Sequence, residues 1–160
     1  MFLGSFEHSL DEKSRVVFPL GFRKNLSEEK LKAGFVLEAG TKNKFIELLP
    51  TEEWLRQEEK LEERYAQGDE KAEEYLIDLH SSAVNVELDK QYRFLLPEAS
   101  RKVAGIVRDV VFIGMGRKIV IYAKERWEER QRKRKESMTP PPPTGKGSGP
   151  GAGSEREGAR

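Results

Sequence analysis

The 160-residue chain contains no cysteine, so it can form neither a disulfide bond nor a thiolate metal site. Long hydrophobic runs are also missing, because the densest apolar stretch, Val110 to Met115, is far too short to span a bilayer. The first six residues hold no basic region and no long apolar segment, and we expect no signal peptide there. These absences fit a protein of a reducing cytoplasm.

Signatures of catalysis and of small-ligand binding are equally scarce. The sequence has no Ser/His/Asp set, no glycine-rich phosphate loop and no nucleotide fingerprint. His8 and His80 have no Cys or His at ligand spacing, so we expect no metal site. Paired carboxylates are common on a predicted polar helix face, where they more often mean solubility than acid–base chemistry. We therefore expect a protein that is not an enzyme and that has no cofactor, metal or small-molecule substrate.

Large apolar side chains are absent from the last 22 residues, which instead hold four consecutive prolines followed by alternating glycines. Such a segment cannot bury enough apolar surface to offset the entropy of ordering it. We therefore predict a disordered tail over residues 139–160. The remaining residues, up to about 138, are enough for one hydrophobic core.

What the sequence does contain is a pattern of five residue types that occurs twice, with every member displaced by 78 positions. The pattern comprises Leu10, Asp11, Arg15, Pro19 and Arg23 in the first copy, and Leu88, Asp89, Arg93, Pro97 and Arg101 in the second. Each copy continues into an apolar strand that starts with lysine, and then a tryptophan. A duplicated unit that spaces an acid and an arginine around a tight turn favours a paired surface over a single catalytic centre.

Each copy is expected to form a strand, a turn, a strand, a short helix and a hairpin. Aspartate opens each turn because its side chain can bond the backbone two residues on, and proline starts each short helix. Between the copies, helical apolar spacing is broken at Gly68 and Asp69. We predict an α+β, mainly β, fold whose parts are a first repeat (1–50), a helical linker (51–79), a second repeat (80–123), a basic C-terminal helix (124–138) and the tail (139–160). A repeat alone would be marginally stable, so the two are expected to share one core.

The net charge of +1 hides an uneven distribution. Residues 51–79 hold 4 basic and 11 acidic residues, a net charge of −7, whereas residues 80–138 hold 14 basic and 8 acidic residues, a net charge of +6. This split favours an anionic partner or self-association between opposite charges, and a solvated charge-rich surface is the alternative. The basic run of Arg130 and residues 132–135 has three interpretations: added DNA affinity, pairing with acidic helices of a neighbouring subunit, or a solubilising helix end.

Together these residues resemble the MraZ family, within the superfamily of SpoVT/AbrB-like swapped-hairpin barrels. The resemblance covers about residues 1–127 and rests on the two Asp-x-x-x-Arg turns with their proline-led helices and hairpins. Two further matches are the opening Met1-Phe2-x-Gly4 and the run Leu48-Leu49-Pro50-x-x-x-Trp54. Glycine often precedes the turn arginine in the family, whereas this chain has Ser14 and Tyr92, so the turns are expected to differ in detail.

The resemblance implies a cytoplasmic, nucleoid-associated transcriptional regulator. Members of the family bind short direct DNA repeats upstream of the division and cell-wall gene cluster and assemble into rings of several subunits. The two repeats of one chain would close a single pseudo-twofold swapped-hairpin β-barrel. A second hypothesis is an antitoxin-like or other protein-interaction module that has the same barrel and no specific DNA target.

Basic residues at and near the turns are the candidate DNA contacts. Arginine can bond a phosphate or the O6/N7 edge of guanine in two places, and lysine supplies a point charge to the DNA backbone. The candidates are Lys13, Arg15, Lys90 and Arg93 at the turns, and secondarily Arg23, Arg101 and Lys102 on the short helices. We expect Asp11 and Asp89 to structure the turns, because an acid that faces phosphates is repelled. The alternative for both arginines is an Asp–Arg pair that fixes the turn without any DNA.

Overall fold

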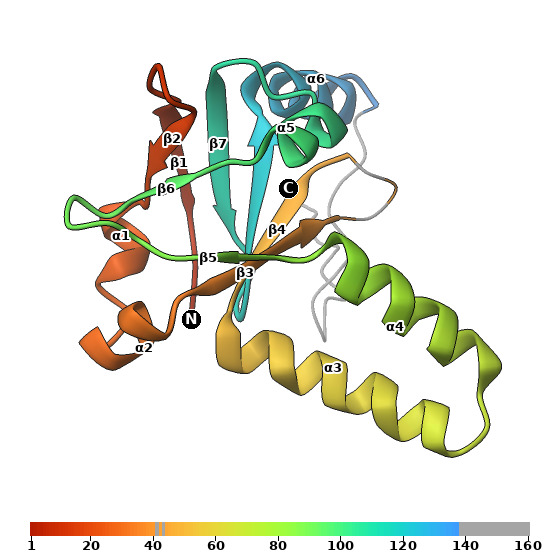
Figure 1. Ribbon diagram of the computed structural model, residues 1–160. Coiled ribbons are helices and arrows are strands. Elements are labelled where there is room, and N and C mark those ends of the chain that lie inside the picture. Colours follow the sequence, from red (N-terminus) through yellow and green to blue (C-terminus); the bar gives the residue numbers. More distant parts are fainter. Residues whose placement is uncertain (41, 43, 138–160) are drawn as a thin grey trace, which may run out of the picture. The chain divides into compact units, whose positions relative to one another are not determined.

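The computed structural model describes residues 1–40, 42 and 44–137, so the predicted tail and the last residue of the predicted basic helix lie outside the described residues. The chain divides into two compact units, Met1–Glu128 and Glu129–Arg160. The described elements (Figure 1) are β1 (Ser5–Ser9), β2 (Arg15–Val17), α1 (Leu20–Arg23), α2 (Glu28–Ala33), β3 (Phe35–Ala39), β4 (Ile46–Pro50), α3 (Thr51–Ala66), α4 (Glu70–Ser82), β5 (Val84–Val86), β6 (Arg93–Leu95), α5 (Glu98–Ala104), β7 (Asp109–Gly114), β8 (Ile119–Ala123) and α6 (Lys124–Glu136).

Six antiparallel strands form one sheet in the order β1-β7-β8-β4-β3-β5. The order is symmetric when the repeats are exchanged, since β1 pairs with β7 and its counterpart β5 pairs with β3. The two hairpins meet where β4 pairs with β8. Each outer strand therefore lies against the hairpin of the other repeat, and neither repeat holds a complete sheet by itself.

A second, two-stranded sheet consists of β2 and β6, one strand from each repeat, and is called the β2–β6 ribbon below. At its centre Val16 lies opposite Phe94, which is its counterpart 78 residues later. Both side chains are buried, at 1% and 2% exposure. Because side chains alternate along a strand, the residues on either side of them face outward.

One hydrophobic core takes side chains from both repeats, as expected. Phe18 and Phe35 of the first repeat have ring centroids 4.9 Å apart, and Phe94 and Phe112 of the second lie 6.2 Å apart. All four belong to the same buried cluster, together with Phe22 and the inward residues of β4, β7 and β8. This shared core fixes the ribbon to the large sheet.

Capping residues set the boundaries of the helices between the strands. At the start of α2, Ser27 Oγ accepts a hydrogen bond from the backbone N–H of Lys30 at 3.2 Å, and at the start of α4, Asp69 Oδ1 accepts one from Lys71 at 3.0 Å. Gly105 follows α5 with φ of 67°, a left-handed conformation that favours glycine. The linker is therefore two helices, divided at the predicted break.

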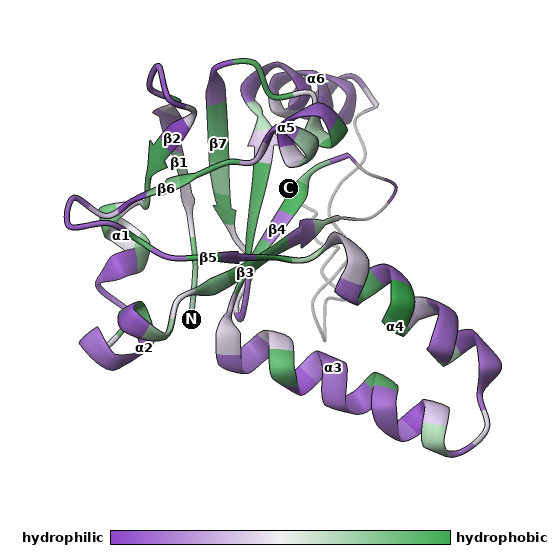
Figure 2. Cartoon of the chain, viewed as in Figure 1, coloured by the Kyte–Doolittle hydropathy of each residue, from purple (hydrophilic) through white to green (hydrophobic). Residues whose placement is uncertain are grey.

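The helices α3 and α4 pack against each other as an antiparallel hairpin that projects from the large sheet (Figure 1). Most of its residues are hydrophilic (Figure 2), in keeping with the net charge of −7 over residues 51–79. At its base, Trp54 lies edge-on to His80 with ring centroids 5.5 Å apart. Four large apolar side chains on the hairpin are nevertheless exposed, namely Leu55, Tyr65, Tyr75 and Ile77.

Among the described residues, Glu38 of β3 is the buried charged residue, with 7% exposure. Burial raises the pKa of its carboxyl to about 7, and the charge of Glu47, its cross-strand neighbour in β4, adds to this shift. Lys118 Nζ lies 3.0 Å from Glu47 Oε2 and partly offsets the effect. The sheet therefore carries a carboxyl that titrates near neutral pH.

The predicted class, α+β with a mainly β core and several helices, is confirmed. The six-stranded sheet is open, because its edge strands β1 and β5 are not paired with each other in the part of the chain that the structure describes. Closure into a swapped-hairpin barrel, like the predicted domain limits, stays a prediction. In that same part of the chain, no helix has both the length and the apolar character needed to cross a bilayer.

Candidate nucleic-acid interface

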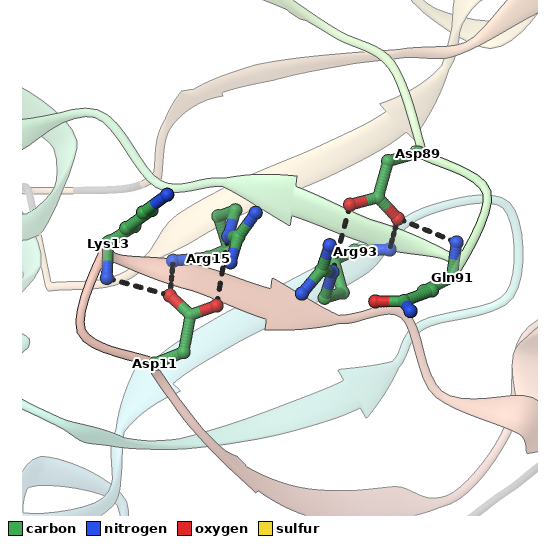
Figure 3. A network of polar contacts seen from close by, with 6 residues as sticks. All are labelled: Asp11, Lys13, Arg15, Asp89, Gln91 and Arg93. Atoms are coloured by element: carbon green, nitrogen blue, oxygen red, sulfur yellow. Dashed lines mark hydrogen bonds and ion pairs between the residues drawn. The ribbon is translucent and has the colours of Figure 1, made fainter.

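The first turn is organised around the carboxylate of Asp11 (Figure 3). Its Oδ1 accepts hydrogen bonds from the backbone N–H groups of Lys13 and Arg15, both at 2.9 Å, and its Oδ2 accepts one from Arg15 Nε at 2.9 Å. The backbone closes the turn, since the N–H of Asp11 donates to the carbonyl of Arg15 at 2.8 Å. A single carboxylate thus fixes both the path of the backbone and the direction of the arginine.

The second turn repeats this arrangement around Asp89. Its Oδ1 accepts from the backbone N–H groups of Gln91 and Arg93 at 2.8 and 2.9 Å, and its Oδ2 accepts from Arg93 Nε at 2.9 Å. Ser14 and Tyr92, at the positions before the arginines, both have φ of 61°. Both residues therefore adopt the positive φ that glycine would permit, and the two turns of this chain have the same backbone conformation.

Backbone hydrogen bonds tie each turn to the strand of the other repeat. The carbonyl of Ser14 accepts from the N–H of Leu96 at 2.9 Å, and the carbonyl of Tyr92 accepts from the N–H of Phe18 at 2.7 Å. The two turns and the β2–β6 ribbon consequently form one connected surface.

Hydrogen bonding lowers the pKa of both turn carboxylates. The backbone N–H of Arg15 is the largest cause that holds the pKa of Asp11 below its ordinary value, and the backbone N–H of Arg93 does the same for the pKa of Asp89. Each carboxylate then faces its own turn, which fits the turn-structuring role predicted for both aspartates. That role remains a prediction until it is tested.

Arg15 and Arg93 lie on the outer face of the β2–β6 ribbon, between the two turns (Figure 3). Their side chains are 31% and 28% exposed. In the described part of the chain, the side-chain hydrogen bonds of both arginines use Nε alone, so the Nη donors are available to a ligand. The structure therefore brings the two main candidate residues together on one face.

Lys13 and Lys90 are exposed at the tips of the two turns, but they are not counterparts in the repeat. The position equivalent to Lys13 is Gln91, and the position equivalent to Lys90 is Glu12. The two ends of the ribbon consequently share a backbone conformation and differ in charge.

The secondary candidates on the short helices have different surroundings. The guanidinium carbon of Arg23 lies 3.7 Å from the ring centroid of Tyr92, a cation–π contact that joins α1 to the second turn. Arg101, the counterpart of Arg23, donates from Nε to the carbonyl of Leu96 at 3.0 Å. Lys102 Nζ lies 3.2 Å from Glu98 Oε2 and is highly exposed. None of the three belongs to a strand of the ribbon, because Arg23 lies in α1 and Arg101 and Lys102 lie in α5.

Two further residues of the outer face were not singled out from the sequence. Val17 and Leu95 occupy equivalent positions in β2 and β6 and are 40% and 56% exposed. The alternation of side chains along a strand could have indicated their exposure, because each of them follows a buried apolar residue.

The predicted basic run lies in the described end of α6, within the second unit. Arg132 forms ion pairs with Glu129 and Glu136, and Lys133 Nζ lies 3.8 Å from Glu129 Oε2. These contacts stabilise the helix, and they are compatible with all three interpretations of the basic run. Over residues 1–40, 42 and 44–137, no group of three or more His, Cys, Asp or Glu residues is placed to hold a metal ion.

Comparison with known proteins extends this description to a family. The sequence profile of the family described as "MraZ protein, putative antitoxin-like" matches residues 1–75 and 79–146. The protein named Transcriptional regulator MraZ from Clostridium tetani is 36% identical over 129 residues, which cover 81% of this chain and 86% of that protein. Proteins of the same name from Syntrophomonas wolfei and Natranaerobius thermophilus are 37% and 38% identical over 130 and 132 residues, and cover 81% and 82% of this chain and 85% and 87% of their own lengths. The profile match includes both Asp-x-x-x-Arg turns.

Proposed function

The chain belongs to the MraZ family, and from this premise we propose that it is a sequence-specific DNA-binding transcriptional regulator that contacts DNA with the β2–β6 ribbon. The observation that carries the proposal is the placement of Arg15 and Arg93 on one outward face, each aimed by its own aspartate. Lys13 and Lys90 extend the basic face at its two tips.

The size of the ribbon suits the major groove of DNA. Neighbouring strands lie roughly 4.8 Å apart, and the major groove, about 12 Å wide, admits a two-stranded ribbon. We assign Arg15 and Arg93 to base edges or phosphates inside the groove, and Lys13 and Lys90 to the phosphates on its sides. Arg23, Arg101 and Lys102 are assigned secondary phosphate contacts, and Asp11 and Asp89 the structuring of the turns.

A single ribbon makes few contacts with DNA, so its affinity would be weak, and each phosphate contact that it makes would steepen the fall of log K with log salt by about 0.9. A ring-like homo-oligomer that presents the ribbon repeatedly along tandem DNA sites gains affinity through effective concentration. The two ends of the ribbon also carry different side chains, because the positions of the second repeat equivalent to Lys13 and Glu12 are Gln91 and Lys90. Subunits that all face one way along the DNA would therefore prefer short direct repeats to palindromes.

The biological target that we propose is the promoter of the division and cell-wall gene cluster, with the protein acting in the cytoplasm at the nucleoid. The acidic α3–α4 hairpin would be repelled by DNA, so we assign it to contacts between subunits of the ring. Closure of each chain into a swapped-hairpin barrel is supported by the symmetric strand order β1-β7-β8-β4-β3-β5.

A gel-shift assay with DNA from upstream of the chain's own operon tests the proposal. We expect a specific complex that unlabelled target DNA competes away and unrelated DNA does not. Light scattering at the working concentration tests the ring, and a monomer there would remove it. Absence of any specific complex would instead favour the protein-interaction module.

A further inference from the structure

We propose that Val17 and Leu95 are specificity-determining residues that read thymine, each through apolar contact with the C5-methyl group of a thymine in the major groove. The inference rests on the proposed function, since it requires the β2–β6 ribbon to enter the groove. It goes further by assigning a base preference to two side chains that carry no charge.

The placement of these two side chains is what requires an explanation. Val16 and Phe94 already fill the inner face of the ribbon, at 1% and 2% exposure. Val17 and Leu95 lie on the opposite face and are 40% and 56% exposed. Exposed aliphatic groups on both strands of a short ribbon form an apolar contact surface that the fold itself does not use.

The register places each aliphatic side chain beside an arginine. Arg15 lies opposite Leu95, and Val17 lies opposite Arg93. Side chains directly opposite each other in an antiparallel ladder have Cβ atoms about 5 Å apart, a span of roughly one to two base-pair steps. The outer face therefore carries two copies of one unit, an arginine next to an aliphatic group.

The chemistry of the unit matches the major-groove edges of DNA. Guanine presents the O6 and N7 acceptors that suit arginine, and thymine presents the C5-methyl group, which suits an apolar side chain. Each unit would then read a guanine and a nearby thymine.

The two units are unequal in reach. Leucine extends one carbon further than valine, and Leu95 is the more exposed of the two residues. We therefore expect Leu95 to contribute more thymine selectivity than Val17.

The test uses the full chain and a duplex that the chain itself enriches from a random-sequence pool. This duplex is compared with the same duplex in which uracil replaces every thymine, a change that removes the C5-methyl groups and keeps the hydrogen-bonding edges. We expect the unmodified chain to bind the thymine duplex more tightly, by roughly fourfold for each methyl group contacted. Leu95→Ala and Val17→Ala should each reduce this ratio, and the double variant should bring it close to one.

Val107→Ala is the matched control, because Val107 is 82% exposed and lies in the loop before β7, off the ribbon. It should keep the full thymine-to-uracil ratio. The variants also separate methyl contact from any effect of uracil on DNA shape, since a shape effect would persist after Leu95→Ala.

Two outcomes would overturn the inference while leaving the proposed function intact. One is specific binding with equal affinity for the two duplexes. The other is a ratio that neither ribbon substitution changes. If the pool yields no enriched sequence at all, the proposed function fails and the inference fails with it.

Discussion

Replacement of both turn arginines by alanine should abolish specific DNA binding and leave the fold in place. The structure gives the cost to stability. The Arg15–Asp11 and Arg93–Asp89 ion pairs join side chains that are 28–38% exposed, and exposed pairs contribute about 0.2–1 kcal/mol each. Each aspartate would still hold two backbone N–H groups of its turn. We expect the double variant to lose no more than about 2 kcal/mol of its free energy of unfolding.

The cost to binding depends on what the arginines touch. If each contacts a phosphate, the slope of log K against log salt falls by about 0.9 per arginine, or roughly 1.8 for each chain bound. If each reads a guanine, about 1–3 kcal/mol of discrimination is lost per arginine and the slope changes little. Fluorescence anisotropy with specific and unrelated duplexes over a range of salt concentrations distinguishes the two cases.

Lys124→Ala is the control for the double variant. It also removes a cation that pairs with a carboxylate, since Lys124 Nζ lies 3.2 Å from Glu7 Oε2, but the pair joins α6 to β1 and includes no residue of the ribbon or of the α3–α4 hairpin. Its affinity for DNA should match that of the unmodified chain. Unchanged affinity and salt slope in a folded Arg15→Ala, Arg93→Ala variant would refute the assignment of the ribbon as the DNA-contacting surface.

Three further predictions concern the fold. Ser14→Gly should raise the free energy of unfolding by up to about 1 kcal/mol in chemical denaturation, because it relieves a positive φ. Tyr92→Gly should raise it by less, since this change also removes the stacking of Tyr92 on Arg23. An equal gain for the two variants would contradict a stabilising role for the stacking. Phe18→Ala should cost about 3–5 kcal/mol in the same assay, because the side chain is fully buried, and a loss below about 1 kcal/mol would contradict that packing. The pKa of Glu38 in the folded chain, about 7, exceeds its ordinary value of 4.5. Between these two pH values the folded chain keeps a proton that the unfolded chain releases. The free energy of unfolding therefore falls as the pH rises from about 4.5 to 7. Glu38→Gln should therefore stabilise by up to about 2 kcal/mol at about pH 8 and hardly at about pH 5, and equal effects at the two pH values would contradict the shift.

The duplicated pattern predicted much of the local structure. The turns at Asp11 and Asp89, the break near Gly68 and the helix end at Gly105 all follow from side-chain chemistry within a few residues, and all are present. The sequence predicted the hairpin partners within each repeat, but it could not supply the strand pairings between the repeats. That β1 pairs with β7 rather than with β3 depends on contacts over about a hundred residues, for which local propensity carries no signal.

The candidate site was likewise predicted only in part from the sequence. The residue types and spacing singled out Arg15 and Arg93 as candidate DNA contacts, and the structure adds that the two lie on one face. The cation–π contact between Arg23 and Tyr92 joins different repeats, so spacing within one repeat could not predict it. The exposure of Val17 and Leu95 required the position of the ribbon relative to the core.

The symmetric strand order has a consequence during synthesis on the ribosome. When the first repeat and the linker have emerged, β1 still lacks β7, β4 lacks β8 and β3 lacks β5, because all three partners are encoded later. The nascent chain must therefore hold unpaired strand edges until residue 123 has left the exit tunnel, and such edges are sites of misassembly between chains.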